Sequence, residues 1–138
     1  MKILINLGRG KAVTVAAGKR QALVFDKEWN DPEKVHRDGA YADWLPKESA
    51  YHLVTLNLVA AGQADGEKLK LTVTEYERDK DTRVKDALGE DKVGNGTTAE
   101  YTLSGLMWMD EKKRYRAEVE NFGTTTVTVE KAYLKVAR

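Results

Sequence analysis

The chain has 138 residues, no cysteine and a formal net charge of +1, with 41% hydrophobic and 33% charged residues. Its length is close to the commonest size of a single domain, and its composition is that of a globular protein rather than a disordered one. The balance of 23 basic and 22 acidic residues argues against nucleic-acid binding, and the missing cysteines exclude disulfides, thiolate catalysis and thiolate zinc sites.

The first residues, MKILINLGRG, fit a strand better than a signal peptide. Their apolar part is too short for a signal peptide, and no small-residue cleavage site follows. No apolar run in the sequence approaches membrane-spanning length. The sequence therefore predicts a protein that is made in the cytoplasm and has no membrane partner.

Alternation of apolar and polar residues, which is typical of half-buried strands, dominates the chain. The pattern predicts strands at residues 2–7, 12–15, 21–26, 51–60, 68–77, 98–109, 114–121 and 124–136. The two glycines of AGQADGE, residues 61–67, indicate a loop of hairpin type. Phe122-Gly123 is expected to form the hairpin between the last two strands.

Two of these strands change the phase of their alternation. At Ser104-Gly105 the apolar face shifts to Leu106 and Trp108, which predicts a bulge. The last strand shifts phase after Val129. A strand that changes its inward face in this way often bends from one sheet of a sandwich to the other.

Two segments interrupt the strand pattern. Residues 27–49 contain both prolines and several aromatic residues, and we expect a long loop insertion there. Residues 78–96 are charged and rich in glycine, and we expect a second loop. Within it, the four-residue spacing of Val84 and Leu88 before Gly89 is compatible with one or two helical turns.

The predicted fold class is therefore all-β. Residues 1–138 are expected to form one domain, an antiparallel β-sandwich of jelly-roll type, because about eight strands with turns between them and little helix favour that architecture. A closed barrel or an immunoglobulin-like sandwich is the alternative.

Motifs that carry chemistry are weak in this sequence. GRGK at 8–11 and AGKR at 17–20 lack the Walker spacing and are predicted turns. Residues 79–91 are rich in carboxylates, but Val84 stands where a calcium-binding loop requires glycine. Asn95-Gly96-Thr97 matches a glycosylation acceptor and, more simply, a turn.

The histidines and serines also give no catalytic pattern. A zinc site would need both His36 and His52 together with carboxylates. Ser49 and Ser104 do not lie in a nucleophile elbow, and no pair of carboxylates stands out as a glycosidase pair. We therefore expect no enzyme, cofactor or metal site.

The aromatic residues of the first insertion are the best candidates for contacts with a partner or a sugar. Trp29, Tyr41 and Trp44, followed by Tyr51, lie close together in the sequence. Exposed Trp and Tyr rings stack on sugars, and buried ones anchor protein interfaces. The alternative is that Trp44 and Leu45 close one open end of the sandwich.

The segment 101–138 resembles the last strands of jelly-roll virion proteins of bacteriophages, namely capsid decoration proteins and receptor-binding heads of tail fibres. It is also similar to jelly rolls of the tumour-necrosis-factor (TNF) and carbohydrate-binding types. The shared pattern is a charged turn at 110–113, Asn121 to Gly123 after the next strand, and a long final strand.

This resemblance implies a non-enzymatic structural protein of a virion, most simply a decoration protein that binds the major capsid protein and stabilises the head. It also implies a homo-oligomer, with a trimer favoured. A carbohydrate-binding module or tail-fibre head that takes a glycan is the alternative, and a glycosidase-like enzyme is a third.

Overall fold

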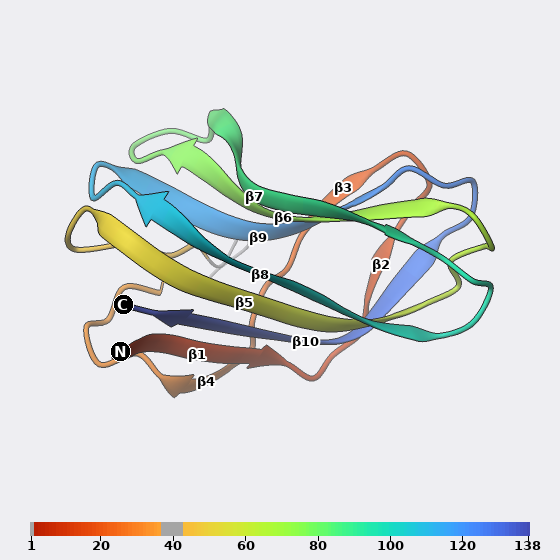
Figure 1. The fold of residues 1–138 in the computed structure, drawn as a ribbon, viewed down its shortest axis with the longest axis horizontal. Coiled ribbons are helices and arrows are strands. Elements are labelled where there is room, and N and C mark those ends of the chain that lie inside the picture. Colours follow the sequence, from red (N-terminus) through yellow and green to blue (C-terminus); the bar gives the residue numbers. More distant parts are fainter. Residues whose placement is uncertain (1, 37–42) are drawn as a thin grey trace.

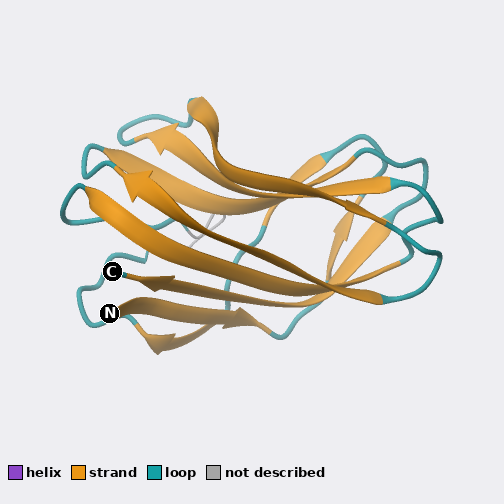
Figure 2. Ribbon diagram, in the orientation of Figure 1, coloured by secondary structure: helices purple, strands orange, loops and turns teal. Residues whose placement is uncertain are grey.

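The computed structural model describes residues 2–36 and 43–138 of the chain. These residues form strands joined by loops and turns, with no helix among them (Figure 2). The strands are β1 (Ile3–Arg9), β2 (Val13–Val15), β3 (Arg20–Ala22), β4 (Lys27–Asn30), β5 (Ala50–Ala61), β6 (Lys68–Glu77), β7 (Arg83–Val93), β8 (Ala99–Met109), β9 (Lys113–Asn121) and β10 (Val127–Ala137). Within this part of the chain, no helix is long and apolar enough to cross a membrane.

The strands build two antiparallel sheets that face each other (Figure 1). The six-stranded sheet has the order β4-β1-β10-β5-β8, with β2 pairing with the start of β10. The four-stranded sheet has the order β3-β9-β6-β7. The predicted antiparallel sandwich is confirmed. The two ends of the chain lie side by side, because the backbones of Lys2 and Arg138 exchange hydrogen bonds of 2.7 and 2.8 Å.

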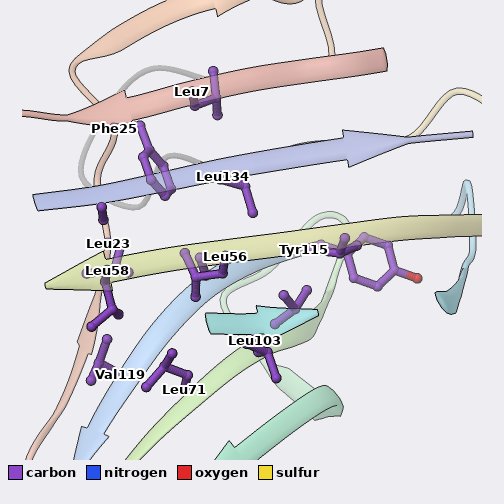
Figure 3. Packing of buried hydrophobic residues seen from close by; sticks show 14 of the residues in the cluster. Leu7, Leu23, Phe25, Leu56, Leu58, Leu71, Leu103, Tyr115, Val119 and Leu134 are labelled. Carbon is purple, nitrogen blue, oxygen red and sulfur yellow. The ribbon is translucent and has the colours of Figure 1, made fainter. Parts of the chain in front are cut away.

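The core fills the space between the inner faces of the two sheets (Figure 3). Leu7, Leu56 and Leu134 project from the six-stranded sheet toward Leu71 and Val119 of the four-stranded sheet. All five side chains are fully buried. Burial of a side chain of this size contributes about 1.5–3 kcal/mol, so the alternating pattern of the sequence is what holds the two layers together.

The connections differ from the hairpins that the turn residues predict. The turn at Phe122-Gly123 joins β9 in one sheet to β10 in the other, so it is not a hairpin. The loop at 61–67 likewise carries the chain from β5 to β6 across the sandwich. Turn residues fix the reversal of the chain but not the sheet that the next strand joins. The same turn residues therefore suit a hairpin and a crossing between sheets.

The prediction of a charged loop with a helical turn at residues 78–96 is wrong. Most of this segment is β7, the edge strand beside β6 in the four-stranded sheet. Charged side chains are common on edge strands, where they discourage pairing with other chains. Leu88 lies across from Val73 and packs against Gly105 of β8. The four-residue spacing of Val84 and Leu88 therefore does not reflect a helix, because both residues lie in β7.

The first insertion is also partly a strand. The residues Lys27–Asn30 form β4, which pairs with β1 at the edge of the six-stranded sheet. Further along, Trp44 pairs with Tyr115 of β9 through backbone hydrogen bonds of 3.0 Å in each direction. The segment around Trp44 thus continues the edge of the four-stranded sheet where β3 ends.

Neither predicted change of phase occurs as expected. The strand β8 keeps an unbroken register with β5, so Leu106 and Trp108 lie on the outer face and not in the core. In β10 the register shifts between Val129 and Lys131, a bulge that keeps the later apolar residues facing inward. The strand therefore stays in one sheet and does not cross to the other.

Candidate functional site: the outer face of the six-stranded sheet

The outer face of the six-stranded sheet carries a graded series of cross-strand pairs between β5 and β8. In order along the strands, the pairs are Tyr51 with Trp108, Leu53 with Leu106, Thr55 with Ser104 and Asn57 with Thr102. All eight side chains are exposed or half-buried. The face is therefore apolar at one end and becomes polar toward the other.

The apolar end consists of Tyr51, Leu53, Leu106 and Trp108. The rings of Tyr51 and Trp108 meet edge to face, with centroids 5.1 Å apart and planes at 76°. Tyr51 is 60% exposed, Leu106 63% and Trp108 52%. Three large apolar side chains that remain in water on adjacent strands form a patch of the kind that marks a binding surface.

The polar band lies next along the strands. The hydroxyl oxygens of Thr55 and Ser104 are 3.3 Å apart, and the Thr102 hydroxyl donates to Asn57 Oδ1 at 2.6 Å. Lys135 of β10 lies across from Thr55 and is exposed. This part of the face offers hydroxyl, amide and ammonium groups.

An aromatic platform completes the face beyond this band. The rings of Trp29 and Tyr133 stack with centroids 6.0 Å apart and planes at 19°. Gly8 is the cross-strand neighbour of Tyr133, and a Cβ at position 8 would stand 2.3 Å from the Trp29 ring. The indole lies against bare backbone because this position has no side chain.

A shallow groove runs beside the platform. It has a volume of about 150 Å³ and is lined by Asn6, Thr55, Asn57, Tyr133, Leu134 and Lys135. The groove and the two rings together combine flat aromatic surface with hydrogen-bonding groups. That combination is suited to a polar ligand with an apolar face.

The predicted contact residues fall in different places. Trp29 is 55% exposed and belongs to the platform, whereas Trp44 is 1% exposed. Tyr41 lies outside the described residues. Tyr51 is exposed at the apolar end of the same face as Trp29. The sequence pattern did not indicate Tyr133 or Trp108 as partners of these residues.

Trp44 occupies the position that the alternative interpretation gives it. Its ring packs against Tyr115 with centroids 6.2 Å apart, and its Nε1–H points to Met109 Sδ at 3.4 Å. It closes one end of the sandwich, beside a cavity of about 10 Å³. That volume holds about one water molecule, so the buried end offers no room for a ligand.

The outer face of the four-stranded sheet holds a network of buried charges. Arg116 donates to Asp43 at 2.6 and 3.2 Å and to Asp81 at 3.0 Å, and Arg114 also binds Asp43. The guanidinium of Arg116 lies 3.9 Å from the centre of the Tyr76 ring. Burial favours the neutral form of Arg116, but Asp43 and Asp81 outweigh it and raise the pKa.

A second group of charges continues along this sheet. Tyr76 donates to both oxygens of Glu118 at 2.9 Å, and burial together with that carboxylate raises the pKa of Tyr76 to about 12. Arg20 binds Glu118 and Asp86, and Lys70 binds Asp86 at 2.7 Å. Burial acts to raise the pKa of Asp86, but hydrogen bonds from Arg20 and Lys70 lower it overall. The paired charges stabilise the sheet and the loops that cover it.

The histidines do not come together as a zinc site would require. His36 groups with Glu28 and Asp31, whose ligand atoms all lie within 4.8 Å of one another. The Asp31 carboxylate accepts the backbone N–H groups of Val35 and His36 at 2.9 and 3.0 Å. This group therefore ties down the turn after β4. His52 lies elsewhere, buried beside the cavity at Trp44.

The candidate serines have partners other than histidine. The Ser104 hydroxyl pairs with Thr55, and the Ser49 hydroxyl accepts the backbone N–H of Glu111 at 3.0 Å. The carboxylate-rich segment 79–91 is spread along the turn before β7 and the strand itself. Two of its carboxylates bind arginines, Asp86 with Arg20 and Asp81 with Arg116.

Comparison with known proteins shows similarity in structure but not in sequence. No family model and no curated protein matches the chain. The structure of Eiger TNF from S. frugiperda superposes with a TM-score of 0.62 and 10% identity, covering 100% of this chain and 93% of that one. Murine APRIL at pH 5.0 gives a TM-score of 0.62 and 4% identity, covering 98% and 99%.

These neighbours are TNF-type proteins and not bacteriophage virion proteins, so they support only part of the resemblance that the sequence suggested. At such low identity the likeness establishes the fold alone. The chain folds as a jelly-roll β-sandwich, the fold that it shares with these neighbours.

Proposed function

We propose that this protein is a non-enzymatic structural protein whose copies associate through the apolar end of the outer face. The observation that carries the proposal is the exposed cluster of Tyr51, Leu106 and Trp108 on adjacent strands. The largest apolar patch on a protein surface is often functional, and exposed aromatic residues of this kind anchor interfaces.

The size of the cluster fits a weak to moderate self-association. Three large side chains that are each more than half exposed present roughly 300 Å² of apolar surface. At about 25 cal/mol per Å², burying that surface contributes about 7 kcal/mol per copy before the costs of association. A standard interface buries roughly 800 Å² on each partner, so the surrounding polar residues supply the remaining area.

We further propose that the assembly is a homotrimer in a bacteriophage virion, most simply a decoration protein on the head. The sequence pattern of residues 101–138 supports this placement. Repetition around a symmetric shell would multiply weak contacts into stable attachment. Contacts of this kind require a rigid scaffold, which two packed sheets provide.

The proposal that the protein is not an enzyme rests on how its polar groups are used. Ion pairs across β3, β6, β7 and β9 join the charges of Arg20, Lys70, Asp86 and Glu118. The serines considered as nucleophiles have hydrogen-bond partners other than histidine. These charged and hydroxyl groups stabilise the fold.

Sedimentation of the full chain tests self-association. We expect the wild type to sediment as an oligomer at micromolar concentration and Trp108→Glu to be a monomer, because a buried unpaired charge would oppose the contact. Val93→Glu is the matched control, since Val93 is 58% exposed on β7 of the other sheet. A monomeric wild type, or equal loss in both variants, would contradict the proposal.

The virion placement has a separate test. Purified protein is mixed with expanded capsids of the phage that carries the gene and is sedimented with them. Co-sedimentation at a fixed number of copies per capsid is the expected result. Recovery of all the protein in the supernatant would argue against a decoration role and would leave self-association unaffected.

A further inference from the structure

We propose that Trp29, Tyr133 and the groove beside them form a saccharide-binding subsite. This inference goes beyond the structural role and does not depend on it. It uses the opposite end of the outer face from the self-association cluster. Tyr51 and Asn57 are six residues apart on β5, which separates the two ends by roughly 20 Å.

The platform is held in place before any ligand arrives. The Trp29 ring occupies the space that a side chain at position 8 would need, and it stacks on Tyr133 with ring centroids 6.0 Å apart. Trp29 nevertheless remains 55% exposed and Tyr133 42% exposed. Rings that are fixed and half in water lose little conformational freedom when a ligand binds, which favours affinity.

Ring chemistry suits a sugar. One face of a pyranose ring presents C–H groups with partial positive charge, and the face of an aromatic ring is negative. Stacking removes apolar surface of both partners from water while the hydroxyl groups of the sugar stay at the edge. Trp29 and Tyr133 keep 55% and 42% of their surfaces in water, and that exposed aromatic surface is available for this contact.

The groove supplies partners for the sugar hydroxyls. Asn6, Asn57 and Lys135 line it and offer amide and ammonium groups. The Thr102 hydroxyl donates a hydrogen bond to Asn57 Oδ1 at 2.6 Å, and this bond orients the amide of Asn57. None of the six described residues that line the groove is acidic. The subsite therefore favours a neutral or anionic sugar over a cationic one.

The same chemistry argues against a second copy of the chain at this end of the face. A dry protein contact would have to satisfy the amide and ammonium groups, and each buried polar group left without a partner costs free energy. A sugar brings hydroxyl groups and water with it, so those groups stay hydrogen-bonded. The apolar end needs no such compensation.

The test is binding of the full-length protein to immobilised oligosaccharides made of glucose, galactose, N-acetylglucosamine or hexuronic acid. We expect the wild type to bind one class, and Trp29→Ala to lose at least tenfold in affinity. Phe122→Ala is the matched control, because Phe122 is also an aromatic residue, is 55% exposed, and lies in the turn between β9 and β10, outside both proposed surfaces. Its sugar affinity should stay within twofold of the wild type, and Tyr133→Phe should retain most of the affinity.

Three results would overturn the subsite. The wild type could bind none of the sugars at millimolar concentration, or Trp29→Ala and Phe122→Ala could lose binding equally, or Trp29→Ala could turn an oligomer into a monomer. The two proposals fail separately. A monomer that binds sugar through Trp29 contradicts only self-association, and an oligomer that binds no sugar contradicts only the subsite.

Discussion

Gly8 lies directly beneath the indole ring of Trp29. A Cβ on residue 8 would stand 2.3 and 2.6 Å from two ring carbons, closer than real contacts allow. Gly8 is also the cross-strand neighbour of Tyr133, on which the same indole stacks. The missing side chain thus determines where the ring of Trp29 lies.

Replacing Gly8 with alanine should displace Trp29 from Tyr133. The methyl group cannot share the space of the ring, and an exposed ring can move away at a cost of about 1 kcal/mol or less. Near-ultraviolet circular dichroism should show the loss of the stacked pair. In a Trp29→Ala background the part of this cost that comes from the ring should disappear, and equal effects of Gly8→Ala in both backgrounds would contradict the contact.

Replacing Trp44 with alanine should destabilise the protein by about 3–5 kcal/mol, because the side chain is fully buried against Tyr115. The control is Trp29→Ala, which removes an exposed indole and should cost about 1 kcal/mol or less. Urea unfolding followed by circular dichroism measures both. Equal losses of stability would show that Trp44 does not close the end of the sandwich.

Replacing Asp43 with asparagine should cost about 3–5 kcal/mol of stability, because Arg114 and Arg116 would lose the one buried carboxylate that binds both of them among the described residues. The Asp81 side chain binds the same arginines but is 54% exposed. The matched variant Asp81→Asn should therefore cost about 1 kcal/mol or less. Chemical unfolding at neutral pH distinguishes them, and a smaller loss for Asp43→Asn than for Asp81→Asn would refute this role.

Stability should fall between neutral and mildly acidic pH because of His52. Burial lowers the pKa of His52 below its ordinary 6.5, although the Ala50 carbonyl and the Glu33 carboxylate oppose the shift. Above pH 6.5 the His52 ring is neutral in both the folded and the unfolded chain, and its full contribution to the free energy of unfolding is present. As the pH falls through 6.5 toward the lower folded pKa, the unfolded chain takes up the proton first, so the free energy of unfolding decreases.

Urea unfolding at pH 7.5 and pH 5.5 measures this dependence. The His52→Gln variant should have a smaller decrease between the two values than the wild type. The chain has two histidines, so His36→Gln is the control and should keep the decrease attributable to His52. An unchanged decrease in His52→Gln would show that another group is responsible.

The jelly-roll sandwich could be predicted because strand alternation is a local property. Leu69, Leu71 and Val73 point to one side of their strand whatever the rest of the chain does, and the structure buries all three. Which sheet a strand joins is not local. The turns at residues 61–67 and 122–123 look like hairpins, yet they cross between sheets.

The charge of β7 misled the prediction for the same reason. An edge strand has one side without a partner strand, and charged side chains there discourage pairing with other chains. Its sequence is therefore as polar as that of a loop. Only the pairing of Thr72 with Gly89 and of Val73 with Leu88 identifies the segment as a strand.

The candidate site, like the fold, could be predicted only in part from the sequence. The sequence by itself determined the supply of aromatic residues, the strand alternation and the absence of cysteine chemistry. Only the tertiary structure decided that Trp44 is in the core and that Trp29 lies on Tyr133. The physical reason is that strand periodicity fixes the side on which a residue projects, whereas its neighbours on that side come from strands that are distant in the chain.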